Sequence, residues 1–208
     1  VSTEDLHHDS AYACLALQKL REWVDDNLAV YSHLTYVSDG AASHFKNCFQ
    51  LHEFPQKNVF HKAQWLFSAT GLGKNACDGV GGLVKHQATL HNLRQLPGKA
   101  IQSANCMVNS LSQKLKGVNF TLLDKDELVE FRERKHEECL GVRAFPGVQS
   151  RHVWLCKTSE ASTCPWKNLQ VHTFRICLRQ NLSYFETYEG RSVLYMMCNL
   201  FYLMYNLL

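Results

Sequence analysis

The chain has 208 residues, of which 46% are hydrophobic, and its formal net charge is +3 with all 11 histidines counted as neutral. This length predicts one large domain, or one domain with an appendage, and the hydrophobic content excludes a wholly disordered chain. A charge balance this mild neither requires nor forbids a nucleic-acid partner, because local patches matter more than the total.

The nine cysteines include no Cys-x-x-Cys pair. Residues 1–5 contain neither a basic region nor an apolar core, so no signal peptide is visible. We therefore expect reduced, mostly buried thiols and a nuclear or cytoplasmic protein that is not secreted.

The chain opens with a helix pattern followed by a strand pattern. Apolar spacing predicts a helix over residues 11–27, which Asp9 or Ser10 can cap. β-branched and aromatic residues predict a strand over 30–37, and a short helix is expected over 41–51.

The middle of the chain repeats this alternation. A second strand is predicted over 63–70, and after a glycine-rich turn a helix is predicted over 78–93. Further helices are predicted over 101–115 and 125–139, with a short strand over 118–123 between them. Strands and helices in alternation indicate an α/β fold.

The last third changes character. Short strands are predicted around 152–156 and 171–178, so we divide the chain into an α/β domain over 1–140 and a small β-rich appendage with an apolar C-terminus over 141–208. The uncharged run 192–208 is shorter than a membrane span and contains two asparagines. A buried strand pair, or sequence from an altered reading frame, is expected there in preference to a membrane anchor.

Two aspartates stand where the first two predicted strands lead into glycine-containing turns. Asp39 closes the first strand, and Asp78 begins the helix after the second. Taken singly, Asp39 is typical of a turn before glycine, and Asp78 is typical of an acid favoured by a helix dipole. Because neighbouring strands can end at one edge of a sheet, the pair can also bind a metal ion that handles phosphate.

The turn Gly71-Leu-Gly-Lys74 does not match a nucleotide-binding loop. The Walker pattern requires glycine at Ser68 and Ser or Thr at Asn75, and the dinucleotide pattern requires glycine at Ala76. These glycines are better explained by a tight backbone path beside the next helix.

Zinc is the other metal considered. Candidate ligands occur between residues 136 and 164, but their spacing matches no finger or ribbon. Buried thiols and surface histidines explain them better; the candidates are His136, Cys139, His152, Cys156 and Cys164.

The segments around the two aspartates resemble motifs of an animal protein family associated with transposable elements. Family members carry SDGxxxQFKN, similar to residues 38–47 here, and FATSHGKxxxDGxGGxxK, similar to residues 67–85. The resemblance extends over residues 5–155, with further landmarks at 7–9 and 145–152.

This resemblance implies a transposase-derived chain with a partial RNase H-like mixed sheet flanked by helices. Asp39 matches the second acid of the catalytic triad and Asp78 the third, so both are implied to be catalytic and to bind Mg²⁺ or Mn²⁺. The implied reaction is cleavage and strand transfer at DNA phosphodiesters. Lys46, Lys74 and Lys85 are the implied contacts to DNA phosphates.

Three departures from the family pattern bear on activity. The first acid should precede Asp39 by several strands, and Asp5 and Asp9 lie too close in the chain to serve, so it is expected to be missing upstream. Leu72 replaces a family histidine, and His44 replaces a glutamine. We therefore expect a truncated domain with little or no strand transfer, and whether it is an enzyme stays open.

Two other functions remain under consideration. The chain can be a non-catalytic nucleic-acid-binding or protein-interaction module that kept the fold and lost the chemistry. A nucleotide-dependent enzyme using the glycine turn is the third hypothesis. No membrane partner is expected, and the sequence does not determine the oligomeric state.

Overall fold

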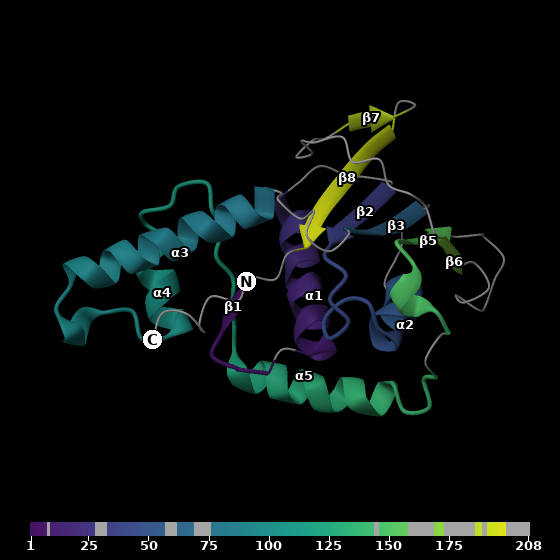
Figure 1. The fold of residues 1–208 in the computed structure, drawn as a ribbon, viewed down its shortest axis with the longest axis horizontal. Coiled ribbons are helices and arrows are strands. Elements are labelled where there is room, and N and C mark those ends of the chain that lie inside the picture. The colour runs from purple at the N-terminus through teal and green to yellow at the C-terminus, as the bar shows by residue number, and fades with distance from the viewer. Residues whose placement is uncertain are drawn as a thin grey trace.

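The computed structural model describes residues 1–7, 9–27, 33–56, 62–68, 76–143, 146–157, 169–172, 186–188 and 191–198. The described helices are α1 (Ser10–Asn27), α2 (Cys48–Gln56), α3 (Ala76–Arg94), α4 (Ala104–Leu111) and α5 (Lys125–Glu138), with short 3-10 turns η1 (Pro97–Lys99) and η2 (Val148–Ser150). The described strands are β1 (Ser2–Thr3), β2 (His33–Ser38), β3 (Lys62–Phe67), β4 (Leu122–Leu123), β5 (Val153–Lys157), β6 (Leu169–His172), β7 (Glu186–Tyr188) and β8 (Arg191–Cys198). This mixture of helices and strands confirms the predicted α/β class (Figure 1).

A six-stranded mixed sheet is the centre of the fold, with strand order β6-β5-β3-β2-β8-β7. β2 pairs in parallel with both β3 and β8, and β3 pairs antiparallel with β5. The described strands of the segment 141–208 thus join β2 and β3 in one sheet. The division into a domain over 1–140 and a small β-rich appendage over 141–208 stays a prediction.

One face of this sheet forms the main core with α1 and α2. Alternate residues of β3 (Ala63, Trp65 and Phe67) are buried, as the period of two in a strand requires. The register places Trp65 between Tyr36 of β2 and Trp154 of β5. The rings of Trp65 and Trp154 pack edge to face with centroids 5.6 Å apart, so large aromatic side chains fill the space beneath the helices.

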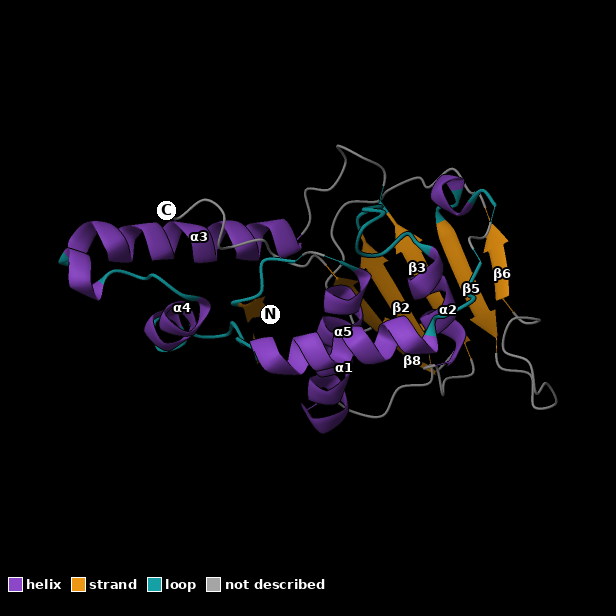
Figure 2. Ribbon diagram, turned by 90° about the horizontal axis from the view of Figure 1, so that it is seen from below, coloured by secondary structure: helices purple, strands orange, loops and turns teal. Residues whose placement is uncertain are grey.

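The second core joins α1 to α5, which crosses it in Figure 2. Tyr12 and Leu15 of α1 pack in a cluster with Leu128 and Phe131 of α5. The short strands β1 and β4 pair in parallel beside this contact. None of the described helices combines the length and the apolar character needed to cross a membrane.

Two predicted helix boundaries differ from the structure because of capping side chains. α2 begins later than the predicted 41–51, since Asn47 Oδ1 accepts a hydrogen bond from Gln50 N at 3.0 Å and so caps a helix that starts at Cys48. α4 begins at Ala104 because Ser103 accepts a bond from Cys106 N at 3.1 Å.

Helices α3 and α4 form an arm that projects away from the sheet in both Figure 1 and Figure 2. Val84 and Ala88 of α3 pack against Ile101 and against Met107 and Leu111, so this arm has a small core of its own. Asn92 Oδ1 accepts a 2.7 Å bond from Ile101 N, which closes the connection between the two helices.

Candidate functional site

The carboxyl ends of β2 and β3 meet at one edge of the sheet. Ser68, directly after β3, donates its backbone N–H to the carbonyl of Ser38 at 2.8 Å, and its Oγ lies 3.2 Å from the same oxygen. Because parallel strands end together, Asp39 follows at this edge, where α/β proteins commonly place ligands. Asp39 therefore lies directly after the end of β2, at the strand-end position that the sequence predicted.

Asp39 presents an exposed carboxylate at this edge. Its Oδ1 accepts a hydrogen bond from Ala41 N at 3.2 Å, which holds the side chain in a turn. The turn explanation and the ligand explanation of Asp39 are therefore compatible, because a carboxylate that accepts one such bond retains further lone pairs.

Lys46 lies beside Gly40, the residue after Asp39, and only 5% of its surface is exposed. Its Nζ is 5.2 Å from the centre of the Phe67 ring, and it is 3.8 Å from the position that a Cβ on Gly40 would occupy. The carbonyl oxygen of Ser68 is 3.9 Å from that same position. A buried ammonium group thus lies against the backbone at the ends of both parallel strands.

The environment of Lys46 is unusual for a lysine. Among the described residues, no carboxylate forms a salt bridge with it. Burial therefore lowers the pKa of Lys46, since desolvation disfavours the charged form and no nearby anion compensates. This cation raises the electrostatic potential at the edge without lying on the outer surface.

His44 connects this edge to the start of α1. The residue is half-buried, and burial lowers its pKa, while the negative charges of Asp39 and Asp9 act in the opposite direction. His44 therefore lies within the electrostatic influence of both carboxylates. In the sequence, His44 is notable only because it replaces a family glutamine. No motif in the sequence predicts that His44 lies near Asp9.

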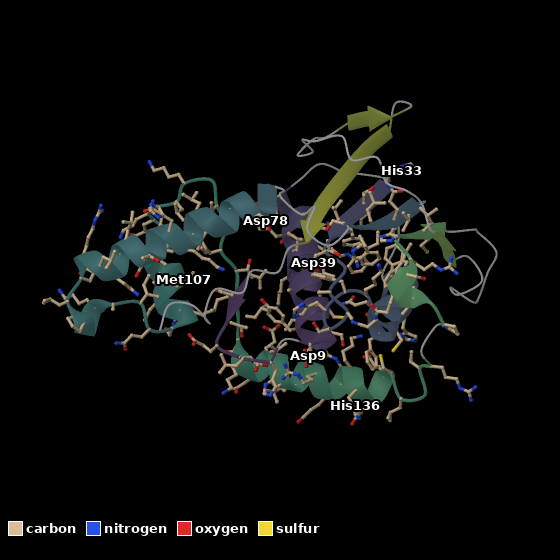
Figure 3. The ribbon with its side chains drawn as sticks, viewed as in Figure 1. Asp9, His33, Asp39, Asp78, Met107 and His136 are labelled. Carbon is tan, nitrogen blue, oxygen red and sulfur yellow. The ribbon has the colours of Figure 1, made fainter. Side chains whose placement is uncertain are left out.

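Asp78 lies in the first turn of α3 and is exposed. In Figures 1 and 2, α3 begins on the side of the sheet towards which β2 and β8 run, and Figure 3 labels Asp39 and Asp78 on this side. Residues 69–75, which connect β3 to α3, lie outside the described residues. Both aspartates are thus exposed at the same end of the sheet.

The three predicted DNA-contacting lysines have different surroundings. Lys46 is buried, Lys85 is half-buried on α3, and Lys74 lies outside the described residues. Lys85 follows Asp78 by seven residues, close to two helical turns, so both are on one side of α3. Lys85 therefore suits a surface contact, whereas Lys46 suits a role beneath the surface.

The oxygen ligands at this edge fit a hard divalent cation in type. Mg²⁺ typically takes one or two protein carboxylates together with water and substrate phosphates, and Asp39 and Asp78 both present exposed carboxylates. In the described part of the chain, no group of three or more His, Cys, Asp or Glu side chains is placed to hold a metal ion. That finding applies to the four described zinc candidates, and Cys164 lies outside the described residues.

A second charged cluster, which the sequence did not single out, joins α5 to the N-terminal segment. Arg132 donates from one nitrogen to Asp5 Oδ2 at 2.6 Å and from Nε to Asp9 Oδ2 at 2.5 Å. Lys135, one turn further along α5, donates to Glu53 of α2 at 2.8 Å. One feature of the sequence could have indicated this cluster. Arg132 and Lys135 each follow an apolar residue of the helix, Leu128 and Phe131, by four positions, so the two cations lie on the buried face.

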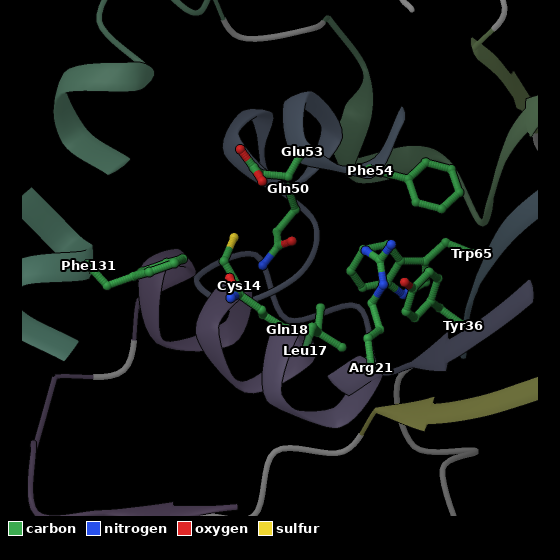
Figure 4. Close-up of a pocket in the computed structure, with 10 residues that line it drawn as sticks. All are labelled: Cys14, Leu17, Gln18, Arg21, Tyr36, Gln50, Glu53, Phe54, Trp65 and Phe131. Atoms are coloured by element: carbon green, nitrogen blue, oxygen red, sulfur yellow. The ribbon is translucent and has the colours of Figure 1, made fainter. Parts of the chain in front are cut away.

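This cluster borders a cleft of about 260 Å³ between α1, α2 and α5, which Asp9, Cys14, Glu53, Arg132, Lys135 and Cys139 help to line. The acids and bases there already pair with one another, so the cluster primarily fastens α5 to the rest of the protein. A smaller cavity of about 40 Å³, shown in Figure 4, lies between α1, α2 and the sheet and has room for only a few water molecules.

Comparison with known proteins gives one family. The family model described as "Domain of unknown function (DUF8701)" matches residues 1–165, which is most of the chain. No curated protein and no solved structure matches the sequence.

Proposed function

We propose that this chain, which belongs to the family described as Domain of unknown function (DUF8701), is a transposase-derived domain of RNase H-like fold. Its ancestral reaction is metal-dependent cleavage and strand transfer at DNA phosphodiesters. One arrangement supports this proposal most directly: exposed Asp39 and Asp78 stand at one end of the sheet, and the buried cation Lys46 lies against the Gly40 backbone directly after Asp39.

The topology of the sheet supports the proposed RNase H-like fold. An RNase H-like core needs a mixed sheet with helices packed on it and an acid at the end of an inner strand. β2 is an inner strand with parallel neighbours on both sides, and Asp39 follows its last residue. The resemblance of residues 38–47 and 67–85 to transposon-associated motifs points in the same direction.

In this proposal, Asp39 and Asp78 hold Mg²⁺ or Mn²⁺. When bound, such an ion activates a nucleophilic oxygen and neutralises charge on the leaving oxygen of a phosphodiester. Lys46 adds positive potential from beneath the Gly40 backbone, which favours an anionic phosphate at this edge. Lys74 and Lys85 are proposed to contact DNA phosphates from the turn and from α3.

We expect little or no strand transfer from this chain by itself. The proposed triad requires a further acid, and the two N-terminal candidates are already engaged: Asp5 is 4% exposed and binds Arg132, and Asp9 binds the same guanidinium group. The structure thus adds a physical reason to the sequence argument that neither residue serves as the first acid.

The test is a titration of Mn²⁺ into the whole chain, followed by calorimetry or by the loss of free-ion paramagnetic resonance signal. The double variant Asp39→Asn/Asp78→Asn should lose the site, whereas Asp25→Asn/Asp26→Asn removes the same charge from exposed positions of α1 and should retain it. Equal binding by the wild type and both double variants would overturn the metal assignment.

The alternative proposal is a module that binds nucleic acid or protein without catalysis. One observation favours it, namely that residues 79–123 contain five lysines and arginines and no Asp or Glu. It predicts DNA binding that weakens with added salt and survives loss of either aspartate.

A further inference from the structure

The arm formed by α3 and α4 has a charge composition unlike the rest of the chain. From residue 79 to residue 123 there is no Asp or Glu, although the whole chain has 19. The same segment contains five lysines and arginines, which are Lys85, Arg94, Lys99, Lys114 and Lys116. All of these residues are described, so the one-sided charge is a property of a folded element.

Several of these cations gather at the end of α3. Lys114, which follows α4, has its Nζ 2.9 Å from His91 Nδ1, so it lies beside the last turns of α3. Arg94 is three residues after His91 and therefore adjacent on the helix surface. Lys99 lies in the connection that the bond from Ile101 N to Asn92 closes. We call Arg94, Lys99 and Lys114, all of them exposed, the basic corner.

Helix stability explains only part of this composition. Cations in the last turn of a helix interact favourably with its dipole, and Arg94 has that position. Lys99 and Lys114 lie beyond the ends of α3 and α4, where this explanation does not apply. It also gives no reason for the absence of acids, which would form favourable pairs with the basic side chains on such an exposed surface.

We propose that the basic corner binds the phosphate backbone of double-stranded DNA. A row of phosphates is complementary to a surface with several cations, and residues 79–123 contribute no acid to it. One acid from outside this segment contacts the arm: Glu4 Oε1 accepts a bond from Asn105 N at 3.1 Å at the start of α4. Exposed amide side chains beside the corner supply hydrogen-bond donors for phosphate and sugar oxygens; they are Gln95, Gln102 and Gln113.

An anionic membrane is the main rival partner. Leu93 and Leu96 are 78% and 73% exposed near the basic corner, and basic residues beside exposed leucines also suit a lipid surface. A helix lying in a membrane needs a continuous apolar face, however, and the apolar stripe of α3 at Val84 and Ala88 is already covered by the α4 side of the arm. The observations therefore favour DNA.

This inference deepens the proposed function, because it names a contact surface for the same partner. It does not depend on the metal site, since the basic corner is formed by residues after Asp78. The two proposals can consequently fail separately.

The experiment measures binding of a fluorescent DNA duplex to the whole chain, without metal, at several salt concentrations. Arg94→Gln/Lys99→Gln/Lys114→Gln should weaken binding at least about tenfold and reduce the slope of log affinity against log salt by about 3, because three phosphate contacts are lost. The matched control Lys125→Gln/Arg134→Gln/Arg143→Gln removes the same charge from exposed positions outside the arm and should change neither quantity substantially.

Several outcomes would overturn the inference: no binding by the wild type, equal losses in both triple variants, or equally tight binding of polyglutamate or phosphatidylserine vesicles. Circular dichroism checks that the variants remain folded. The variant Asp39→Asn/Asp78→Asn separates the proposals, since it should lose metal binding and retain metal-free DNA affinity. A variant that loses only metal binding therefore bears on the proposed metal site at the end of the sheet, and a variant that loses only DNA affinity bears on the basic corner.

Discussion

Lys135 of α5 and Glu53 of α2 form an ion pair at 2.8 Å in which each side chain is only 10% exposed. Burial alone would lower the pKa of Lys135, but its hydrogen bonds to Glu138 and Glu53 raise it, so the ammonium stays charged. The pair joins two helices that are distant in the sequence, and it lies under the same cleft as Arg132.

We predict that Lys135→Met lowers the free energy of unfolding by about 3 to 5 kcal/mol, because Glu53 is left as a buried carboxylate without its cation. The double variant Lys135→Met/Glu53→Leu should recover most of this loss, since neither charge then remains. Urea unfolding followed by circular dichroism measures both.

The neighbouring exposed cation Arg134 gives the control for this prediction. Arg134 pairs with Glu138 at 4.0 Å, with the two side chains 60% and 46% exposed, so Arg134→Met should cost less than about 1 kcal/mol. Similar losses for Lys135→Met and Arg134→Met would contradict the importance of burial in this pair.

The Asp5–Arg132 contact predicts how stability depends on acid. Burial would raise the pKa of Asp5, but hydrogen bonds from the His7 backbone, Arg132 and the His7 side chain lower it to about 2 from 3.8. Because the folded protein releases this proton more readily than the unfolded chain, Asp5 stabilises the fold above pH 3.8. This contribution, on the order of 2 kcal/mol, is lost as the pH falls towards 2.

Chemical unfolding of Asp5→Asn and wild type at a series of acidic pH values measures this effect. The difference in unfolding free energy between the two should be greatest near neutral pH and should shrink as Asp5 becomes protonated. Asp126→Asn, at an exposed position in the first turn of α5, serves as the control for the removal of one carboxylate. A constant difference for Asp5→Asn across the acidic range would contradict the lowered pKa.

The sequence predicted helices and strands well where the hydrophobic period was clear. The spacing of Leu15, Leu17 and Val24 in α1 and the alternation of Ala63, Trp65 and Phe67 in β3 reflect burial on one face, and burial is what the fold shows. The α2 boundary was wrong because Asn47 caps the helix, and many residues before it are compatible with either helix or turn.

Long-range relationships were beyond the sequence pattern. Nothing in the neighbours of Lys46 indicates that it is buried against Phe67, since its sequence context reads as a surface segment. Likewise, Arg132 meets Asp5 and Asp9 across more than a hundred residues. Pairing of β5 with β3 joins the late strands to the main sheet, and it depends on a register that no local motif encodes.

The cysteines should differ in their reactivity towards a thiol reagent. Cys106 is exposed, whereas Cys139 and Cys156 are buried, and burial raises the pKa of both buried thiols. Since the thiolate is the reactive form, iodoacetamide at neutral pH should label Cys106 well before Cys139 or Cys156. Peptide mass spectrometry at successive times measures the order, and unfolding in urea should remove the difference. Early labelling of Cys156 in the folded protein would contradict its burial.

Lys46 gives the most direct stability test at the proposed site. Its ammonium group is desolvated without a described salt bridge, so Lys46→Met should leave the free energy of unfolding unchanged or raise it by about 1 kcal/mol at neutral pH. The half-buried Lys85→Met is the control and should change stability by less than about 0.5 kcal/mol.

The pH dependence of the Lys46→Met effect follows from the direction of the pKa shift. Because the folded pKa of Lys46 lies below 10.5, the folded protein loses this proton before the unfolded chain does, and wild-type stability gains a contribution as the pH rises towards 10.5. The methionine variant lacks this contribution, so any advantage it has at neutral pH should diminish in alkaline solution. Urea unfolding at neutral and alkaline pH measures the change. A Lys46→Met variant that is strongly destabilised at neutral pH, with no alkaline change, would show that the contacts of the ammonium group, including the one with the Phe67 ring, outweigh its desolvation. Lys46 could not then be the uncompensated charge that the proposed phosphate edge requires.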